Sequence, residues 1–222
     1  MATLSVGGTT VFDGAVLQSG VTGSPVLTLP STTTFPAGHV LQIQTSHLKD
    51  LWGYTNTTAW DWGTASTRAD QSHGSIIDDL SLTLTAKGTN SDFYITLMLN
   101  QVGNGALTGG FNQAVNIYSS ADTYANPIDR GNQDGSNRSR VSSGAWLTLA
   151  NGEFSGITMN SNLKQTGASI AKGATISYRV AMSTKYTSGS GNILWINKYN
   201  SDADQTYSMR SVNTLQVIEV AT

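Results

Sequence analysis

The three histidines of this sequence, His39, His47 and His73, are the residue type best suited to ligating a metal. Catalytic zinc sites often use three histidines and leave one position open. His39 and His47 stand close together in the sequence, with no Cys or Glu beside them. A three-histidine metal site is one interpretation of this pattern. Polar histidines at the surface or in turns account for it more simply, and we expect no metal.

Carboxylates and nucleophiles offer little basis for catalysis. Glu153 and Glu219 are the only glutamates, whereas glycoside hydrolysis needs two carboxylates that flank the scissile bond. There is no Gly-x-Ser-x-Gly elbow and no cysteine. Glu219 stands in an apolar run, where a carboxylate buried without a partner is costly. Arg210 is one candidate partner, and a half-exposed position is the alternative. We expect a structural Glu219 and no enzyme.

Two turn segments, "NSDADQ" and "GNQDGSN", are rich in oxygen ligands of the kind that calcium prefers. Neither matches the twelve-residue calcium loop that ends in Glu. Asp, Asn and Gly at this density are also ordinary turn formers. We expect no cofactor, and calcium binding by one of these loops stays open as an alternative.

The segment "LWGYTNTTAWDWG" concentrates aromatic side chains. Trp52, Tyr54, Trp60 and Trp62 lie close together in it, and we take these four as the candidate binding residues. Exposed aromatics offer a large contact area at low entropic cost, which favours a protein interface. They could also stack on the sugar rings of a polysaccharide. A small local core over one end of the domain is the third interpretation.

The composition limits the class of protein. The chain has 222 residues, a formal net charge of −2 and only 12% charged residues. This charge gives no electrostatic reason to expect binding to nucleic acid or to an anionic membrane. The amino-terminal residues lack the basic region and apolar core of a signal peptide. No apolar run reaches the length of a membrane span. We expect a soluble protein.

Alternating apolar and polar residues predict strands with one buried face. The clearest examples are "DLSLTLTAK" (79–87) and "ATISYRVAMS" (174–183). In "DFYITLMLNQV" (92–102), Tyr94 and Met98 make the second face apolar as well, so we expect one face in the core and the other against a partner. Shorter strands are expected at 26–29, 40–45, 114–118, 146–149, 156–159, 193–197 and 215–220.

About ten short strands separated by Gly-rich turns predict an all-β fold, an antiparallel two-sheet sandwich of the jelly-roll type. The first residues are less patterned. We therefore expect an amino-terminal arm at residues 1–26 and the sandwich at residues 27–222.

Several spaced motifs resemble structural proteins of tailed bacteriophages, especially marine and cyanobacterial phages. Residues 36–42 match a Pro-Ala-Gly-His-Val-Leu-Gln core common in that family. Near the carboxyl end, Ile196 and Asn197, Arg210 and Ser211, and Glu219 stand in the places of the family's closing pattern. The resemblance covers roughly residues 27–222. The aromatic segment departs from it, because the family has a Thr/Ser-rich connector there.

The resemblance implies a homotrimeric jelly-roll protein of the virion, made in the cytoplasm of a bacterial host. Its role would be that of a capsid decoration or cement protein, or of a head- or tail-fibre component, with major capsid or tail proteins as partners. A receptor-binding tip that recognises host surface glycans is the alternative function. A polysaccharide depolymerase fits less well, because paired carboxylates are missing.

Overall fold

The computed structural model describes residues 3–6, 9–13, 16–17, 36–56, 75–105, 109–129, 141–149, 157–185, 192–197 and 210–222. The chain divides into two compact units, Met1–Phe35 and Pro36–Thr222. The candidate strand at 26–29 lies outside the described residues.

The first unit contains a small antiparallel sheet in place of an unpatterned arm. Its strands are β1 (Thr3–Val6), β2 (Thr9–Asp13) and β3 (Val16–Leu17), paired in that order. The pairing sets Leu4 opposite Phe12 and Phe12 opposite Leu17. The strands are too short for alternation to be recognised in the sequence, which explains why they were not expected.

The second unit contains two antiparallel sheets. The first has the order β4-β14-β8, with β11 on the other edge of β8. Its strands are β4 (Val40–Leu48), β14 (Asn213–Val220), β8 (Asp92–Gly105) and β11 (Ile157–Gln165). β13 (Asn192–Ile196) pairs with the far end of β8, and β5 (Trp52–Asn56) pairs with β13, so these two strands extend the sheet beyond β14 and β4.

The second sheet runs β10-β9-β12, and both β7 and β6 pair with β12. These strands are β10 (Ser143–Leu149), β9 (Gly109–Ser119), β12 (Thr175–Lys185), β7 (Leu82–Thr85) and β6 (Ser75–Ile76). The described helices are two short 3-10 turns, η2 (Asp78–Leu80) and η3 (Ser120–Asp122). The all-β prediction is confirmed. None of the helices in the described part of the chain is long and apolar enough to cross a membrane.

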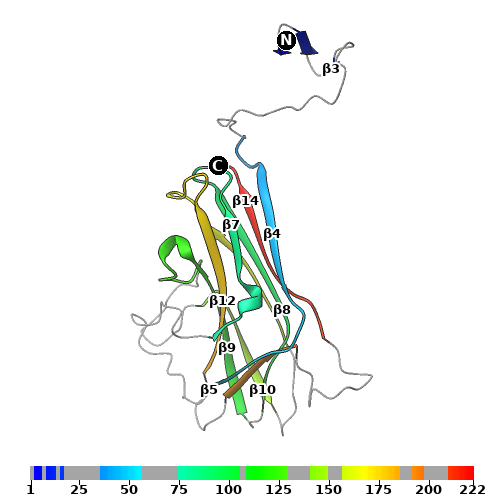
Figure 1. Ribbon diagram of the computed structural model, residues 1–222. Helices are drawn as coiled ribbons and strands as arrows, with labels where there is room; N and C mark the ends of the chain where they lie inside the picture. The colour runs from blue at the N-terminus through cyan, green and yellow to red at the C-terminus, as the bar shows by residue number, and fades with distance from the viewer. Residues whose placement is uncertain are drawn as a thin grey trace. The chain divides into compact units, whose positions relative to one another are not determined.

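The last strand lies in the interior of its sheet. β14 pairs with β4 on one side and with β8 on the other, as the red ribbon between β4 and β8 shows in Figure 1. Leu215 and Val217 are fully buried, and the residues between them are half-buried. This carboxyl-terminal strand, whose sequence is apolar enough for the core, is therefore tied down by a neighbouring strand on each edge.

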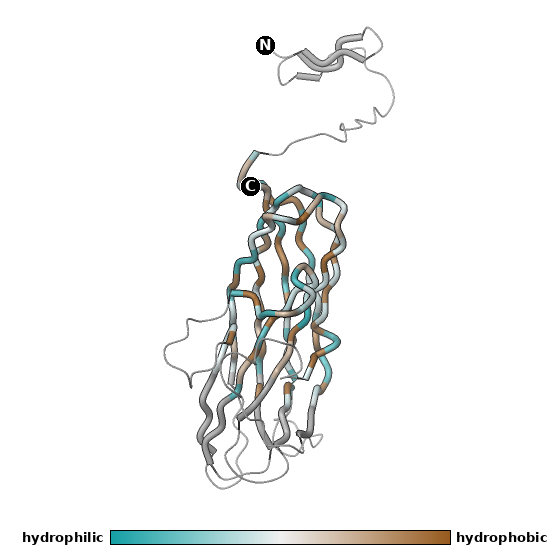
Figure 2. The backbone as a smooth tube through the Cα atoms, turned by 90° about the vertical axis from the view of Figure 1, so that its left-hand side faces the viewer, coloured by the Kyte–Doolittle hydropathy of each residue, from teal (hydrophilic) through white to brown (hydrophobic). Residues whose placement is uncertain are grey.

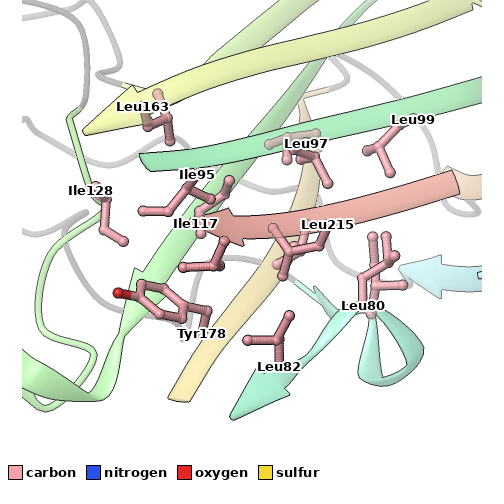
Figure 3. Packing of buried hydrophobic residues seen from close by; sticks show 14 of the residues in the cluster. Leu80, Leu82, Ile95, Leu97, Leu99, Ile117, Ile128, Leu163, Tyr178 and Leu215 are labelled. Carbon is pink, nitrogen blue, oxygen red and sulfur yellow. The ribbon is translucent and has the colours of Figure 1, made fainter. Parts of the chain in front are cut away.

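Apolar residues from both sheets meet in one core. Figure 3 shows Leu97 and Leu215 of the first sheet together with Ile117 and Tyr178 of the second. The rings of Phe93 and Tyr178 lie 6.3 Å apart between their centroids, across the two sheets. The alternation expected along β7, β8 and β12 is confirmed by burial, and Figure 2 shows it as brown and teal alternating along the strands.

Some elements differ from the sequence-based expectation. β5 is a strand where a loop was expected, because its partner β13, itself paired with β8, supplies the pairing that the Gly- and Thr-rich sequence of β5 does not predict. The segment 79–87 begins within the 3-10 turn η2, and its strand is only Leu82–Thr85. Tertiary pairing decides both cases.

Candidate functional site

The Glu219 carboxylate lies at the centre of a buried hydrogen-bond cluster, which we call the carboxylate clamp. Glu219 is fully buried. Its oxygens accept hydrogen bonds from the Lys87 backbone N–H at 2.9 and 3.0 Å and from the Gly88 N–H at 2.8 Å. The Gln42 side-chain amide donates a further bond of 2.5 Å to Glu219 and another to the Thr85 carbonyl. The clamp thus ties β14, β4 and the turn after β7 together.

The clamp settles the alternatives left open for Glu219. The half-exposed position is wrong, because the side chain is completely buried. Backbone amides and Gln42 stabilise the charge by hydrogen bonding, while the Arg210 guanidinium lies 3.9 Å from Asp50. Hydrogen bonds from N–H groups are what a buried carboxylate needs when no cation pairs with it. Every bond described for this carboxylate holds the fold together, as the structural interpretation expected.

Neighbouring side chains lie close to Gly88, beside the clamp. A Cβ at Gly88 would lie 2.3 Å from the Ser91 hydroxyl and 2.7 Å from a methyl of Leu41. The glycine therefore lets the turn after β7 approach Glu219 closely enough for its N–H to donate.

Two buried asparagines fasten the point where β13 ends and β14 begins. Asn197 adopts a left-handed backbone (φ 63°), and its side chain donates to the Asp50 carbonyl and accepts from the Ser211 N–H and hydroxyl. Asn213 accepts from the Asn100 N–H at 2.6 Å and donates to the Leu48 carbonyl. The end of β13 and the start of β14, which pair with the same edge of β8, are thus held by side-chain hydrogen bonds. Asparagine tolerates the left-handed backbone better than most residues do.

The structure describes half of the predicted aromatic site. Trp52, at the start of β5, is half-buried and packs against the core. Tyr54 lies in the middle of β5, opposite Leu194 in the ladder. Trp60 and Trp62 lie outside the described residues, so the site formed by the four residues stays a prediction.

The histidines do not assemble a metal site in the part of the chain that the structure describes. His39 and His47 are exposed, and the His47 ring nitrogen lies 3.3 Å from the Thr214 hydroxyl. His73 lies outside the described residues. No group of three or more potential metal ligands occurs among the described residues.

One face of the molecule stands open to solvent. We call it the outer face: it is the side of the sheet β4-β14-β8-β11 that points away from the core. Three rows of residues cross the four strands in register: Ile43, Ile218, Tyr94 and Lys164; Thr45, Gln216, Thr96 and Asn162; and His47, Thr214, Met98 and Asn160. The large apolar side chains among them are unusually accessible, with Ile43 55% exposed and Tyr94 and Met98 each 43% exposed.

The only fixed charge in these rows is neutralised within the chain. The Lys164 ammonium lies 2.6 Å from the Asp92 carboxylate and 5.6 Å from the centre of the Tyr94 ring. The Asp92 hydrogen bond raises the pKa of Lys164, although the side chain is open to water. A shallow pocket beside this pair is lined by Tyr94, Asn162, Lys164 and Asp129 among others. The ammonium occupies one side of the ring on which a sugar would have to stack.

Part of the outward side of the opposite sheet is buried within the chain. Tyr118 faces away from the core, since it stands opposite Arg179 in the ladder, yet it is only 1% exposed. The segment after β9 runs back beside this strand, with a backbone bridge between Pro127 and Tyr118, and the Arg179 guanidinium lies 4.2 Å from the ring centre of Tyr124. The two sheets therefore differ: the outward-facing Tyr118, Ala114 and Ala181 of the second sheet are buried within the chain, whereas large apolar residues on the outward side of the first sheet are accessible.

Sequence reasoning missed most of these interactions. Glu219 drew attention as a charge within an apolar run, but nothing in the sequence identified Gln42 as its partner, since the two are 177 residues apart. Asn197 and Asn213 each stand at the boundary of a strongly apolar strand. This position was the signal that could have identified them as residues that hydrogen-bond the strand ends.

Comparisons with known proteins find weak structural likenesses only. No family model matches the chain, and no curated protein matches it. A structure of infectious bursal disease virus, Gx strain, is similar with a TM-score of 0.31 and 12% identity, over 89% of this chain and 44% of that chain. The crystal structure of the infectious bursal disease virus VP2 subviral particle gives a TM-score of 0.29 and 12% identity, over 89% and 46%. The chain spans less than half the length of these chains.

Proposed function

We propose that the protein is a non-enzymatic structural protein of a bacteriophage virion, either a capsid decoration or cement protein or a component of a head or tail fibre. The observation that carries the proposal is that residues of the motifs on which the resemblance rests are hydrogen-bonded to one another in the structure. Gln42 ends the first motif and Glu219 closes the last, and the two side chains are bonded in the carboxylate clamp. Asn197 and Ser211 of the closing pattern are bonded to each other as well. Motifs that build one fold are expected to occur together in a family.

The strand order supports a jelly roll as part of this proposal. Eight strands form two sheets of four, β4-β14-β8-β11 and β7-β12-β9-β10. In chain order the strands change sheet at nearly every step, from β4 to β7, β7 to β8, β8 to β9 and β10 to β11. This exchange between sheets, with a last strand that returns beside the first, is what two nested Greek keys produce. In this scheme β5 and β13 are an added hairpin-like extension.

The partners in the proposal are other copies of the chain, as a homotrimer, and the major capsid or tail proteins of the virion. A virion location follows from the same proposal. No nucleic acid, membrane or cofactor takes part in it.

Particle binding tests the proposal. Purified protein is mixed with phage particles that lack it, and the particles are pelleted and imaged with gold-labelled antibody. We expect saturable binding at regular positions of the capsid or tail. Purified protein that leaves every part of the particle unlabelled, and antibody that finds none on native particles, would contradict the proposal.

A receptor-binding tip is the second candidate function. The observation that favours it is the extension formed by β5 and β13, which carries Trp52 and Tyr54 beyond the ends of β4 and β14. Trp60 and Trp62 follow in the sequence. If this function holds, changing both Trp60 and Trp62 to Ala is expected to abolish binding to host cells and to leave the melting temperature unchanged. Unchanged cell binding would eliminate it.

A further inference from the structure

We propose that the outer face of β4-β14-β8-β11 is the surface through which copies of this chain associate. The inference rests on the homotrimer of the proposed function and names the surface that would form it. It also explains why β8 is apolar on both sides, with Phe93 and Leu97 in the core and Tyr94 and Met98 outside it.

The contrast between the two sheets is the first argument. A sheet that faces water on one side normally carries polar residues there. The chain covers the outward side of the β9–β12 pair by itself, so that Tyr118, Ala114 and Ala181 are all buried. It leaves Ile43, Tyr94 and Met98 accessible on the outer face. Ile43, Ile218 and Tyr94 stand side by side across three strands, and contiguous apolar side chains rimmed by polar ones mark an interaction surface.

The polar groups of the outer face suit a second copy of the same chain. No position of its three rows carries a carboxylate, and Lys164 at the edge strand is paired with Asp92. Depletion of charge is the compositional mark of interface centres. The central row consists of Thr, Gln and Asn side chains, which both donate and accept hydrogen bonds. A face of this kind can pack against a neighbouring copy without bringing like charges together.

The area is adequate for such an interface. Four strands about 4.8 Å apart, each with about eight paired residues that rise about 3.3 Å, make a flat rectangle of roughly 500 Å². Side chains standing on the sheet add accessible area. Stable interfaces begin near ~600 Å² per partner. An association that buries most of the outer face therefore reaches the lower end of the stable range.

Charge substitutions on the two sheets test the inference. In the full chain, Ile43→Lys and Met98→Lys place charges on the outer face at positions that are accessible in the single chain, so the fold should tolerate them. Thr175→Lys is the matched control, because it is an exposed strand position of the other sheet. Mass is measured by light scattering and folding by circular dichroism. We expect the mass of a trimer for the parent and the control, and the mass of a single chain for each of the two outer-face variants.

A second measurement introduces no charge on the outer face. Because the chain has no cysteine, Thr96→Cys and Thr175→Cys each give one thiol, and both positions are exposed in the single chain. We expect maleimide to react slowly at position 96 in the oligomer and quickly after mild dissociation, with fast reaction at position 175 throughout.

The outcomes separate this inference from the proposed function. A monomeric parent, outer-face variants that keep the parent's mass, or equally fast reaction at positions 96 and 175 would each overturn the inference. A monomeric parent whose glycan binding is lost in Ile43→Lys would assign the face to a carbohydrate instead. None of these readouts involves virus particles, so particle binding can succeed or fail independently.

Discussion

At the scale of single residues, the carboxylate clamp predicts that replacing one carboxylate oxygen of Glu219 with an amide nitrogen lowers the stability of the fold considerably. Glu219→Gln keeps the volume but replaces a charged acceptor with an amide whose NH₂ would face the Lys87 and Gly88 donors. Hydrogen bonds to a charged group contribute about 1.5–3 kcal/mol, and a donor left unpaired costs more. We expect the free energy of unfolding in urea to fall by about 2–3 kcal/mol.

Asp79→Asn is the matched control for this change. Asp79 lies exposed in η2, so the same carboxylate-to-amide substitution should change stability by less than about 0.5 kcal/mol. If the two variants unfold at the same urea concentration, the clamp contributes nothing beyond ordinary surface chemistry.

Tyr178 predicts a loss of stability at high pH. Burial raises the pKa of Tyr178, and the charge of Glu219 raises this pKa further. Above the unfolded-state pKa of about 10, the unfolded chain therefore releases a proton that the folded chain keeps. The contribution of this group is complete below about pH 10 and is lost as the pH rises, by about 1.4 kcal/mol per pH unit.

Tyr178→Phe isolates this contribution. The variant loses the 2.9 Å hydrogen bond from the Tyr178 hydroxyl to the Gln165 amide oxygen, so it should be less stable than the parent at pH 8. The difference in unfolding free energy between parent and variant should shrink from pH 10 to pH 11. A difference that stays constant over this interval would contradict the assignment.

The sequence predicts residues better when their partners are near in the chain. Alternation along β7, β8 and β12 identified the buried residues, because side-chain direction in a strand depends on position alone. Pairs such as Gln42 with Glu219, or Asn100 with Asn213, depend on which strands become neighbours. Local patterns contain no information on that choice. The sequence therefore indicated that Glu219 is structural and left its partners unidentified.

At the scale of elements, β14 is the strand on which the first sheet depends. Removing the last eight residues, Leu215–Thr222, takes away a strand that pairs on both edges and leaves β4 without a neighbour. Leu215 and Val217 each contribute about 1.5–3 kcal/mol by burial, and the clamp is lost as well. Because a domain is stable by only ~5–15 kcal/mol, we expect no soluble folded protein.

Circular dichroism and soluble yield measure this outcome. Deleting Thr222 alone is the control, since it removes an exposed residue with one side-chain bond to the Asn90 carbonyl, and we expect it to fold normally. A chain ending at Thr214 that still melted cooperatively near the parent temperature would show that β14 is dispensable.

Element boundaries were harder to predict than the existence of elements. β14 and β12 were expected nearly as found, because their alternation is strong and uninterrupted. β5 was missed, since its aromatic, Gly and Thr residues resemble a loop until β13 lies beside them. The same holds for β1–β3, whose pairing is local but whose strands are short. Sequence pattern therefore predicts strands whose own alternation marks a buried face. It misses strands that form only because a neighbouring strand pairs with them.

At the scale of the whole molecule, the division into two units predicts that the second unit folds alone. All residues of the described core lie between Leu48 and Val217. The first unit has 35 residues and no cysteine, and domains below about 40 residues usually need a disulfide, a metal or a partner to fold. A fragment of residues 36–222 is expected to melt at the temperature of the full chain.

The same fragment distinguishes two ways of holding copies together. The outer face belongs entirely to the second unit, so association through it should survive removal of Met1–Phe35, and the mass of the fragment by light scattering should equal three fragments. A folded but monomeric fragment from an oligomeric full chain would assign association to the first unit instead. In that case the Leu4, Phe12 and Leu17 positions, which are paired in β1–β3, would be the ones to change next.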